Sequence, residues 1–329
     1  MARSKRRKRI VIIGGGTGLS TLLRGLKKFP VDLTAIVTVA DDGGSSGRLR
    51  DDYDIPPPGD IRKVMAALSD VEPLVEEMFQ YRFSSSNDLG GHSLGNLMLT
   101  ALTDITGDFS HAIREMSRVL NVNGTVLPAA NQRITLHAEL EDGTIVTGES
   151  KIPTYNQRIH RVFLSPNDVK PLPDTIRAIE RADLLIFGPG SLYTSILPNL
   201  MVQGIRDAIL ASKVPNVYIC NLMTQAGETH NYSAADHVRA LMYHMGAPFI
   251  DTILLNTDEV PQSVQRVYEQ EQSKPVSYDE TRLTQLGINV VKKDIATIRE
   301  GAIRHEATKV AEWLVQYAEE NESMRNQQT

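Results

Sequence analysis

The stretch Arg9-Ile10-Val11-Ile12-Ile13 runs directly into Gly14-Gly15-Gly16-Thr17-Gly18, and this junction decides the fold. The apolar, β-branched run predicts a strand that is buried on both faces of a parallel sheet. The leucines of Leu19–Leu26 follow at helical spacing, so a helix comes next. Glycine lets the backbone turn tightly and lets a phosphate approach, while the first helical turn offers free N–H groups to an anion. We therefore expect a phosphate-binding turn at Gly14–Gly18.

The spacing of these glycines differs from that of two common nucleotide-binding motifs. Counting from Gly14 and Gly16, the third glycine of G-x-G-x-x-G would fall on Leu19, and no Gly-Lys-Ser/Thr follows as in a P-loop. Binding of a nicotinamide dinucleotide such as NAD is thereby disfavoured, although it stays open. The alternative is a tight turn that binds nothing, but such a turn needs fewer glycines than the four found here.

The composition is that of an ordinary soluble globular protein, with 41% hydrophobic and 23% charged residues in a chain of 329. A net charge of −5 gives no basic field for nucleic acid. Cys220 is the single cysteine, which excludes an internal disulfide and a cysteine-rich metal site and fits a reducing compartment. No apolar run approaches the roughly 20 residues that cross a membrane. We therefore expect a cytoplasmic protein without a transmembrane segment.

Six basic side chains crowd residues 3–9, and no apolar signal-peptide core follows them. We expect residues 1–8 to form a disordered basic tail, with binding to an anionic surface as the alternative. At the other end, residues 321–329 are expected to fray into a second disordered tail. Residues 9–320 between these tails would then form a single α/β domain that binds a nucleotide.

An acidic and glycine-rich turn, Asp41-Asp42-Gly43-Gly44-Ser45-Ser46-Gly47, follows the apolar run Leu33–Ala40. In a doubly wound sheet the carboxyl end of this second strand lies beside the first glycine turn. There Asp41 or Asp42 would accept ribose hydroxyls or hold Mg²⁺ against a phosphate. The turn also matches G-x-S-x-G, but we expect a polar loop to continue to Pro58. A nucleophile elbow needs a strand–turn–helix context, so we exclude that type of hydrolase site.

Two further segments combine a helix start with polar side chains. Gly59–Leu68 is expected to be a helix, with Asp60 either as its N-cap or at the site, and with Arg62 facing an anion. A glycine turn within residues 89–99 opens another helix. His92 in this turn has no visible partner, so a general base, a ligand contact and a structural role all stay open.

Residues 122–166 have a different sequence pattern from the rest of the chain, because apolar and polar residues alternate there with a period of two. The runs Ile134–Leu140 and Thr144–Thr147 predict two antiparallel strands joined by a hairpin turn at 141–143, and Arg161–Leu164 predicts a third strand. We therefore expect a small antiparallel β insertion within an α/β chain. No pattern in it indicates a catalytic group.

Three more apolar runs, Asp183–Phe187, Val217–Cys220 and Ile250–Asn256, predict further parallel strands. The turn Gly188-Pro189-Gly190-Ser191 follows the first of them, and Asn221–Gln225 follows the second. Since the carboxyl ends of such strands lie along one edge of the sheet, the polar turns should form one long crevice. The expected fold is a three-layer, doubly wound, Rossmann-like α/β fold with a mainly parallel sheet and the small antiparallel insertion.

A nucleotide also needs a flat partner for its base and a fixed cation for its diphosphate, and the glycine turns supply neither. Tyr268, in a polar segment, and Arg304, just after Gly301, lie outside any clear core pattern. We expect Tyr268 to contact the base or the sugar and Arg304 to contact the phosphates. The alternative is that Tyr268 packs on the surface while Arg304 pairs with Glu300 or Glu306.

Several of these motifs resemble those of the CofD-like superfamily. They are Gly14–Gly18, Asp41–Gly47, Gly59-Asp60-x-Arg62, Gly188–Ser195 and Asn221–Thr229. The superfamily has an enzyme branch, which contains 2-phospho-L-lactate transferase, and a branch of bacterial gluconeogenesis factors. The resemblance covers about residues 9–315. The chain length, the triple-glycine turn and residues 191–200 are most similar to the gluconeogenesis factors.

The resemblance implies a cytoplasmic protein that binds a nucleotide-sugar such as UDP-N-acetylglucosamine. It also implies a role in cell shape and wall synthesis during growth on gluconeogenic carbon sources, so cell-wall synthesis proteins are candidate partners. No secure reaction is implied for this branch, and a homo-oligomer stays open.

The alternative function is a group transferase of the 2-phospho-L-lactate transferase type. It would use a nucleotide-diphosphate donor, with Mg²⁺ at Asp41 or Asp42 neutralising the leaving diphosphate. Aromatic residues make up only 5% of the chain, which disfavours a site that stacks a flavin-like acceptor.

Both hypotheses place the ligand in the same crevice. The residues expected to bind it are Gly14, Gly15, Gly16, Thr17, Gly18, Asp41, Asp42, Gly43, Gly44, Ser45, Ser46, Asp60, Arg62, Asn96, Gly188, Gly190, Ser191, Asn221, Met223, Thr224, Tyr268 and Arg304.

Overall fold

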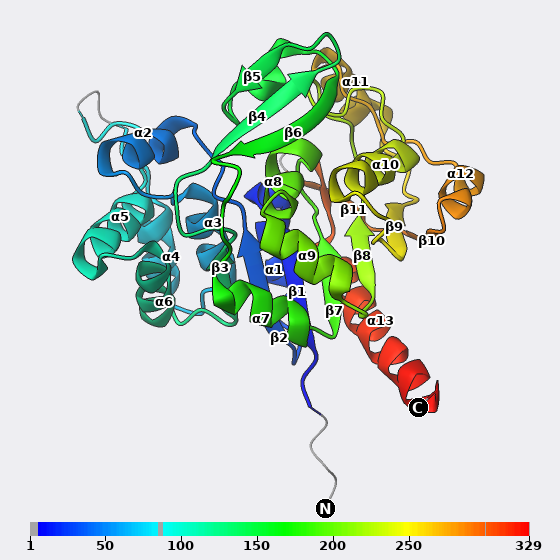
Figure 1. Cartoon of the computed structure of the whole chain (residues 1–329), viewed down its shortest axis with the longest axis horizontal. Helices are drawn as coiled ribbons and strands as arrows, with labels where there is room; N and C mark the ends of the chain where they lie inside the picture. The colour runs from blue at the N-terminus through cyan, green and yellow to red at the C-terminus, as the bar shows by residue number, and fades with distance from the viewer. Residues whose placement is uncertain (1–5, 85–87, 300, 329) are drawn as a thin grey trace, which may run out of the picture.

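The computed structural model describes residues 6–84, 88–299 and 301–328, and its centre is a seven-stranded sheet (Figure 1). The strands follow one another in the order β10-β9-β8-β7-β1-β2-β3, and every neighbouring pair is parallel. They are β1 (Arg9–Gly14), β2 (Asp32–Val37), β3 (Thr125–Pro128), β7 (Leu184–Phe187), β8 (Asn216–Ile219), β9 (Thr252–Asn256) and β10 (Asn289–Lys293). The expected α/β class with a mainly parallel sheet is confirmed.

Strand β1 lies where the order of the strands reverses, between β2 and β7. Its residues Ile10–Ile13 are at most 2% exposed, because helices cover both faces of the sheet. Ligands of open α/β sheets bind outside the carboxyl ends of the strands at such a reversal. In this chain that position is the glycine turn.

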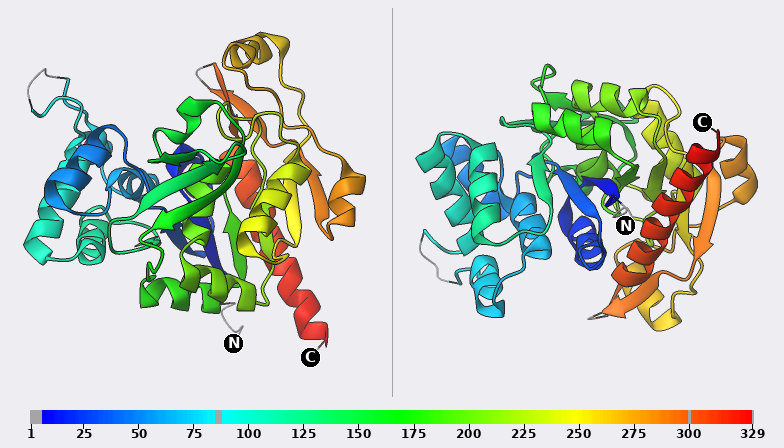
Figure 2. Two further views of the ribbon diagram at one scale, coloured as in Figure 1. Left: turned by 45° about the horizontal axis from the view of Figure 1, so that its top comes forward. Right: turned by 90° about the horizontal axis from the view of Figure 1, so that it is seen from below.

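The helices form the two outer layers. α1 (Gly16–Leu26) and α13 (Ala307–Gln328) pack together on one face of the sheet, while α7 (Pro173–Arg181) and α9 (Gln203–Ala211) pack together on the other (Figure 2). The remaining helices are α2 (Gly44–Tyr53), α3 (Gly59–Leu68), α4 (Pro73–Gln80), α5 (Leu94–Thr106), α6 (Phe109–Val119), α8 (Leu197–Leu200), α10 (Ala234–Met245), α11 (Gln262–Gln270), α12 (Glu280–Gln285) and the short turns η1 (Ile152–Tyr155) and η2 (Leu192–Ile196).

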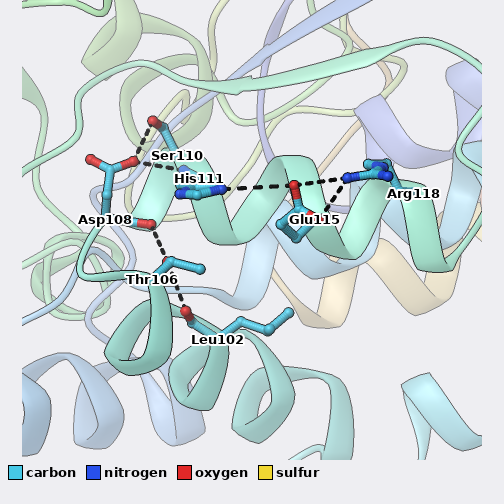
Figure 3. Close-up of polar contacts among 7 residues, drawn as sticks. All are labelled: Leu102, Thr106, Asp108, Ser110, His111, Glu115 and Arg118. Atoms are coloured by element: carbon cyan, nitrogen blue, oxygen red, sulfur yellow. Dashed lines mark hydrogen bonds and ion pairs between the residues drawn. The ribbon is translucent and has the colours of Figure 1, made fainter.

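Helices α5 and α6 are joined by a short turn, in which a glycine ends the first helix and polar side chains cap the second (Figure 3). Gly107, with a φ of 69°, ends α5. Asp108 caps α6 by accepting hydrogen bonds from the backbone N–H of His111 and the hydroxyl of Ser110. Thr106 donates to the carbonyl oxygen of Asp108 at 3.0 Å. The hairpin therefore has a fixed turn, and its first helix packs against α2 and α3.

The antiparallel insertion consists of β4 (Thr135–Leu140) between β5 (Ile145–Thr147) and β6 (Ile159–Ser165). Every second residue of β4 is buried, as its period of two predicts. The hairpin turn between β4 and β5 lies where we expected it, and the N–H of Gly143 donates there to the carbonyl oxygen of Leu140.

The expected start of this insertion at residue 122 is wrong. β3 pairs in parallel with β2 as the edge strand of the main sheet, so the antiparallel strands run only from 135 to 165. A strand of four residues that ends in Pro128 is too short to show a period in the sequence.

The expected polar loop after Gly43 is also wrong, because Gly44–Tyr53 forms helix α2. Its glycines and serines have low helix propensity, but Leu49 and Arg50 are buried and the helix packs against α5. Tertiary packing therefore overrides the local preference. A nucleophile elbow stays excluded, since β2 ends at Val37, well before Gly43.

Both ends of the chain differ from the tails that we expected. Residues 1–5 lie outside the described residues, but Arg6 forms an ion pair with Asp183 and Lys8 is buried, so a disordered tail is wrong for 6–8. We expected fraying after residue 321, whereas the described backbone continues as α13 to Gln328. In the described part of the chain, no helix is both long and apolar enough to cross a bilayer.

Candidate functional site

The glycine turn brings the start of α1 to the carboxyl edge of the sheet. Gly16 opens the helix with a φ of 69°, a value that favours glycine, and its N–H donates to Asp60 Oδ2 at 2.8 Å. A Cβ at Gly15 would lie 2.7 Å from that oxygen, and one at Gly18 would lie 2.8 Å from the carbonyl oxygen of Pro189. Close packing therefore explains part of the glycine content. The other N–H groups of the first turn lack intrahelical partners and remain for an anion.

A cavity of about 580 Å³, here named the first cavity, opens beside this turn at the carboxyl ends of β1, β7 and β8. It brings together residues that the sequence analysis drew from separate segments. Those lining it are Gly15, Gly16, Thr17, Gly18, Gly190, Ser191, Asn221, Met223, Thr224, Tyr268 and Arg304. Gly14 and Gly188, which we also expected at the site, are not among the residues that line the cavity. They pack against each other, and a Cβ at Gly14 would lie 3.9 Å from Gly188 Cα.

Tyr268 lies on α11, and Arg304 lies on β12 (Ala302–His305), which pairs with β11 (Ala296–Arg299). The hydroxyl of Tyr268 accepts a hydrogen bond from the N–H of Ile303 at 3.2 Å, which fixes the ring beside β12. Among the described residues Arg304 donates only to the carbonyl oxygen of Ile303 and forms no ion pair with Glu306. Glu300, the other expected partner, lies outside the described residues.

Side-chain hydrogen bonds join the turn after β7 to the turn after β8. Gln225 donates to Ser191 Oγ at 2.9 Å, and Asn221 donates to the amide oxygen of Gln225 at 3.4 Å. Nearby, the buried carboxyl of Glu228 accepts a hydrogen bond from the hydroxyl of Thr194 at 2.9 Å. Burial raises the pKa of Glu228 to about 7, and the Thr194 bond acts in the opposite direction.

Asp41 and Asp60, here named the acidic group, lie on the β2 side of the glycine turn and outside the lining of the first cavity. Asp41 accepts a hydrogen bond from the N–H of Gly43 at 2.9 Å. Burial raises the pKa of Asp41, the Gly43 bond opposes this, and the nearby charge of Asp60 adds to it. Asp60 is not the N-cap of α3, because Pro58 takes that position. Its carboxylate instead turns toward Gly16.

The β insertion reaches this acidic group through Gly148–Ser150. Asp42 accepts a hydrogen bond from the N–H of Ser150 at 2.8 Å. Burial raises the pKa of Glu149 to about 8, and the charge of Asp41 contributes next. The sequence analysis missed Glu149, because it follows an alternating strand and no motif marks it.

A buried chain of hydrogen bonds runs from α2 to α3. The hydroxyl of Ser45 bonds with Nδ1 of His92 at 3.0 Å and accepts from the side-chain amide of Asn96 at 3.0 Å. The amide oxygen of Asn96 accepts from Nε of Arg62, also at 3.0 Å. All four residues are at most 6% exposed. His92, whose role the sequence left open, is thus a buried member of this network, and burial lowers its pKa.

Close contacts shape the acidic turn itself. Gly44 opens α2 with a φ of 46°, and a Cβ at Gly59 would lie 2.2 Å from the hydroxyl oxygen of Ser46. Across the residues that the structure describes, no group of three or more His, Cys, Asp or Glu side chains is arranged to hold a metal. Asp41 and Asp42 would therefore ligate Mg²⁺ only together with phosphate oxygens of a ligand.

Comparison with known proteins identifies the family. The sequence matches the family described as 2-phospho-L-lactate transferase CofD over residues 10–296, which is most of the chain. The chain belongs to the CofD family. It is 61% identical to a Bacillus subtilis protein named gluconeogenesis factor, over 95% of this chain and 98% of that protein. A Listeria monocytogenes protein of the same name is 48% identical, over 93% of this chain and 94% of its own length.

A solved structure agrees with this assignment. The crystal structure of a Bacillus halodurans protein matches with a TM-score of 0.93 and 55% sequence identity, and the match covers 94% of this chain and 100% of that one. The resemblance drawn from the motifs is therefore confirmed. Within the CofD family, the chain belongs to the branch of gluconeogenesis factors.

Proposed function

We propose that this CofD-family protein binds a nucleotide-sugar, represented by UDP-N-acetylglucosamine, in the first cavity. The diphosphate lies on the first turn of α1 and is held by Arg304, while Tyr268 offers its ring to the base. In this role the protein acts as a gluconeogenesis factor in the cytoplasm, and it supports cell shape and wall synthesis during growth on gluconeogenic carbon.

One observation supports this proposal most: Gly16–Gly18, Tyr268 and Arg304 line a single cavity. Backbone N–H groups and the helix dipole stabilise an anion at the start of α1. A guanidinium group offers a planar fork of donors that fits two phosphate oxygens. Among the described residues that line this cavity, Glu271 is the one carboxylate. The Asp60 carboxylate lies outside the lining but accepts from the N–H of Gly16, so the diphosphate would use the donors of Thr17 and Gly18 together with Arg304.

Calorimetric titration with UDP-N-acetylglucosamine tests the proposal. Arg304→Ala should weaken binding by about 1.5–3 kcal/mol, the scale of a hydrogen bond to a charged group. Arg304→Lys should recover only part of this, because a point charge does not reproduce a bidentate fork. Arg299→Ala is the matched control, since Arg299 is exposed on the same hairpin and does not line the cavity. Equal affinities for all four proteins would remove Arg304 from the site, and a wild type that does not bind would overturn the proposal.

The group transferase is a second candidate, and the acidic group beside the glycine turn favours it. Asp41, Asp60 and Glu149 lie close enough for their charges to interact. Mg²⁺ held by Asp41, Asp42 and a bound diphosphate would neutralise a nucleotide leaving group. Chromatography should then detect Mg²⁺-dependent release of nucleotide from a nucleotide-diphosphate donor, and Asp41→Asn should slow it. Absence of release by the wild type at every donor and acceptor concentration would count against catalysis.

A further inference from the structure

A second cavity, of about 650 Å³, lies at the carboxyl ends of β8 and β9. Asn221 and Leu222 line both cavities, so the two meet at the turn after β8. The loop between β9 and α11, which runs from Asn256 to Gln262, also lines the second cavity. A ligand that is held by its phosphates on α1 therefore has a neighbouring space into which one end can extend.

The charges of the two cavities differ in sign. The first has Arg304 and the start of α1. The described lining of the second includes the carboxylates of Asp258 and Glu259 and no lysine or arginine. A phosphate in the second cavity would be repelled by these carboxylates. The charge of Lys309 acts on Asp258, but Lys309 does not line the cavity and already pairs with Asp294 at 2.9 Å. The second cavity therefore suits an uncharged group rich in hydrogen-bond donors.

The loop before α11 supplies the groups that such a ligand would need. Gln265 lines the cavity and donates its side-chain N–H to the carbonyl oxygen of Val260 at 2.6 Å, and its amide oxygen is not used by that bond and can act as an acceptor. Glu259 and Gln262 are exposed at the cavity wall, and neither side chain has a hydrogen-bond partner among the described residues. Asp258, in contrast, already accepts from the N–H of Ala296 at 3.0 Å.

Part of the lining of the second cavity is apolar. Leu222, Pro275 and Val276 line it, and the N–H of Val276 donates to the carbonyl oxygen of Leu222 at 3.0 Å, which fixes the two segments together. A pyranose ring has this same two-sided character, with hydroxyls at its edge and C–H groups on its face. A carboxylate with two free oxygens accepts from two neighbouring hydroxyls at once.

We infer that the second cavity receives the hexose end of the nucleotide-sugar. Its hydroxyls donate to Glu259 and Gln265, Gln262 completes the polar wall, and its apolar face packs on Leu222. The inference rests on the proposed function, because the diphosphate in the first cavity positions the hexose beyond Asn221. The nucleoside then remains in the first cavity.

Calorimetry with two ligands, UDP-N-acetylglucosamine and UDP, separates the two ends. Glu259→Ala combined with Gln262→Ala should weaken the binding of UDP-N-acetylglucosamine by about tenfold or more, the scale of one hydrogen bond to a charged group. The affinity for UDP should not change. Glu269→Ala is the matched control, because Glu269 is an exposed carboxylate of α11 that lines neither cavity. Glu259→Gln alone should give a smaller loss, since the amide keeps one acceptor oxygen.

Each other outcome has a defined meaning, provided that thermal unfolding shows the variants to be folded. An equal loss for UDP and for UDP-N-acetylglucosamine would place the nucleoside in the second cavity and overturn the inference. Unchanged affinities for both ligands would also overturn it, while the proposed function would stand. A wild type that binds neither ligand would overturn the proposed function and the inference together.

Discussion

At the scale of single residues, Glu149 lies among several other carboxylates and has a raised pKa. It follows β5 on the insertion, yet its carboxyl faces the charges of Asp41, Asp42, Asp60 and Glu228. Between the ordinary pKa of 4.5 and the raised value of about 8, the folded protein holds a proton that the unfolded chain has released. By linkage, the free energy of unfolding falls as the pH rises through this interval.

Replacing Glu149 by Gln tests this directly, because the amide copies the neutral carboxyl at every pH. Glu149→Gln should raise the free energy of unfolding at pH 8 by on the order of 1–3 kcal/mol and change it little at pH 5. Urea unfolding at both pH values measures the difference. Glu312→Gln, at an exposed position of α13, is the control and should show no such pH dependence. If the free energies of unfolding of the wild type and of Glu149→Gln depended on pH in the same way, the raised pKa of Glu149 would be contradicted.

The candidate site residues that the sequence pointed to are those in turns of unusual composition. Gly16, Asp41 and Ser191 lie in turns that are rich in glycine, aspartate, serine or threonine. A purely structural turn rarely needs so many of these residues together. Glu149 is a single acid after a strand, and only the folding of the insertion onto Asp42 brings it to the acidic group. His92 stood out in the sequence as a candidate, but its hydrogen-bond partner Ser45 is distant along the chain. Only the structure therefore shows that His92 belongs to a buried network.

At the scale of elements, the turn between α5 and α6 gives a prediction about stability. The hydrogen bonds that Asp108 accepts from Ser110, His111 and Asn131 lower its pKa, although burial opposes this. Asp108→Ala should lower the free energy of unfolding by about 1–2 kcal/mol at neutral pH, the usual cost of losing an N-cap. Because the pKa is depressed in the folded state, this stabilisation should disappear as the pH falls below about 4. Asp108→Asn keeps an N-cap and should lose much less in the same chemical unfolding assay.

Elements whose pattern is strong locally were predictable, and elements that depend on distant contacts were not. β1 and β7 are continuous apolar runs, and the alternating β4 carries its own period. β3 has four residues and gains its place only by pairing with β2. α2 begins with glycine and serine and is helical because Leu49 is buried. Such segments have no local signal that distinguishes them from loops.

At the scale of the whole molecule, the β insertion lies over the carboxyl edge of the main sheet (Figure 1) and is attached to it at separate points. The N–H of Ser150 donates to Asp42, and Asn156 donates its side-chain N–H to the amide oxygen of Gln272 at 3.0 Å. A Cβ at Gly227 would lie 1.9 Å from the carbonyl oxygen of Pro153. The insertion therefore joins the turns after β2 and β8 to the segment that follows α11.

The attachment at Gln272 would couple the insertion to a ligand bound in the first cavity. Glu271 and Ser273, on either side of Gln272, line the first cavity, whereas no residue of β4, β5 or β6 does. A ligand that orders this segment should therefore slow amide hydrogen exchange in those three strands. Asn156→Ala should abolish the slowing and leave the calorimetric affinity within about threefold. Asn123→Ala, an exposed asparagine outside the insertion, should preserve it.

Exchange that slows equally in wild type and Asn156→Ala would show that the hydrogen bond to Gln272 carries no coupling. If the coupling is present, the insertion does more than cover the strand ends. Its outer surface would then be more rigid when the cavity is filled, so a macromolecule that binds the three strands would respond to the ligand without contacting it.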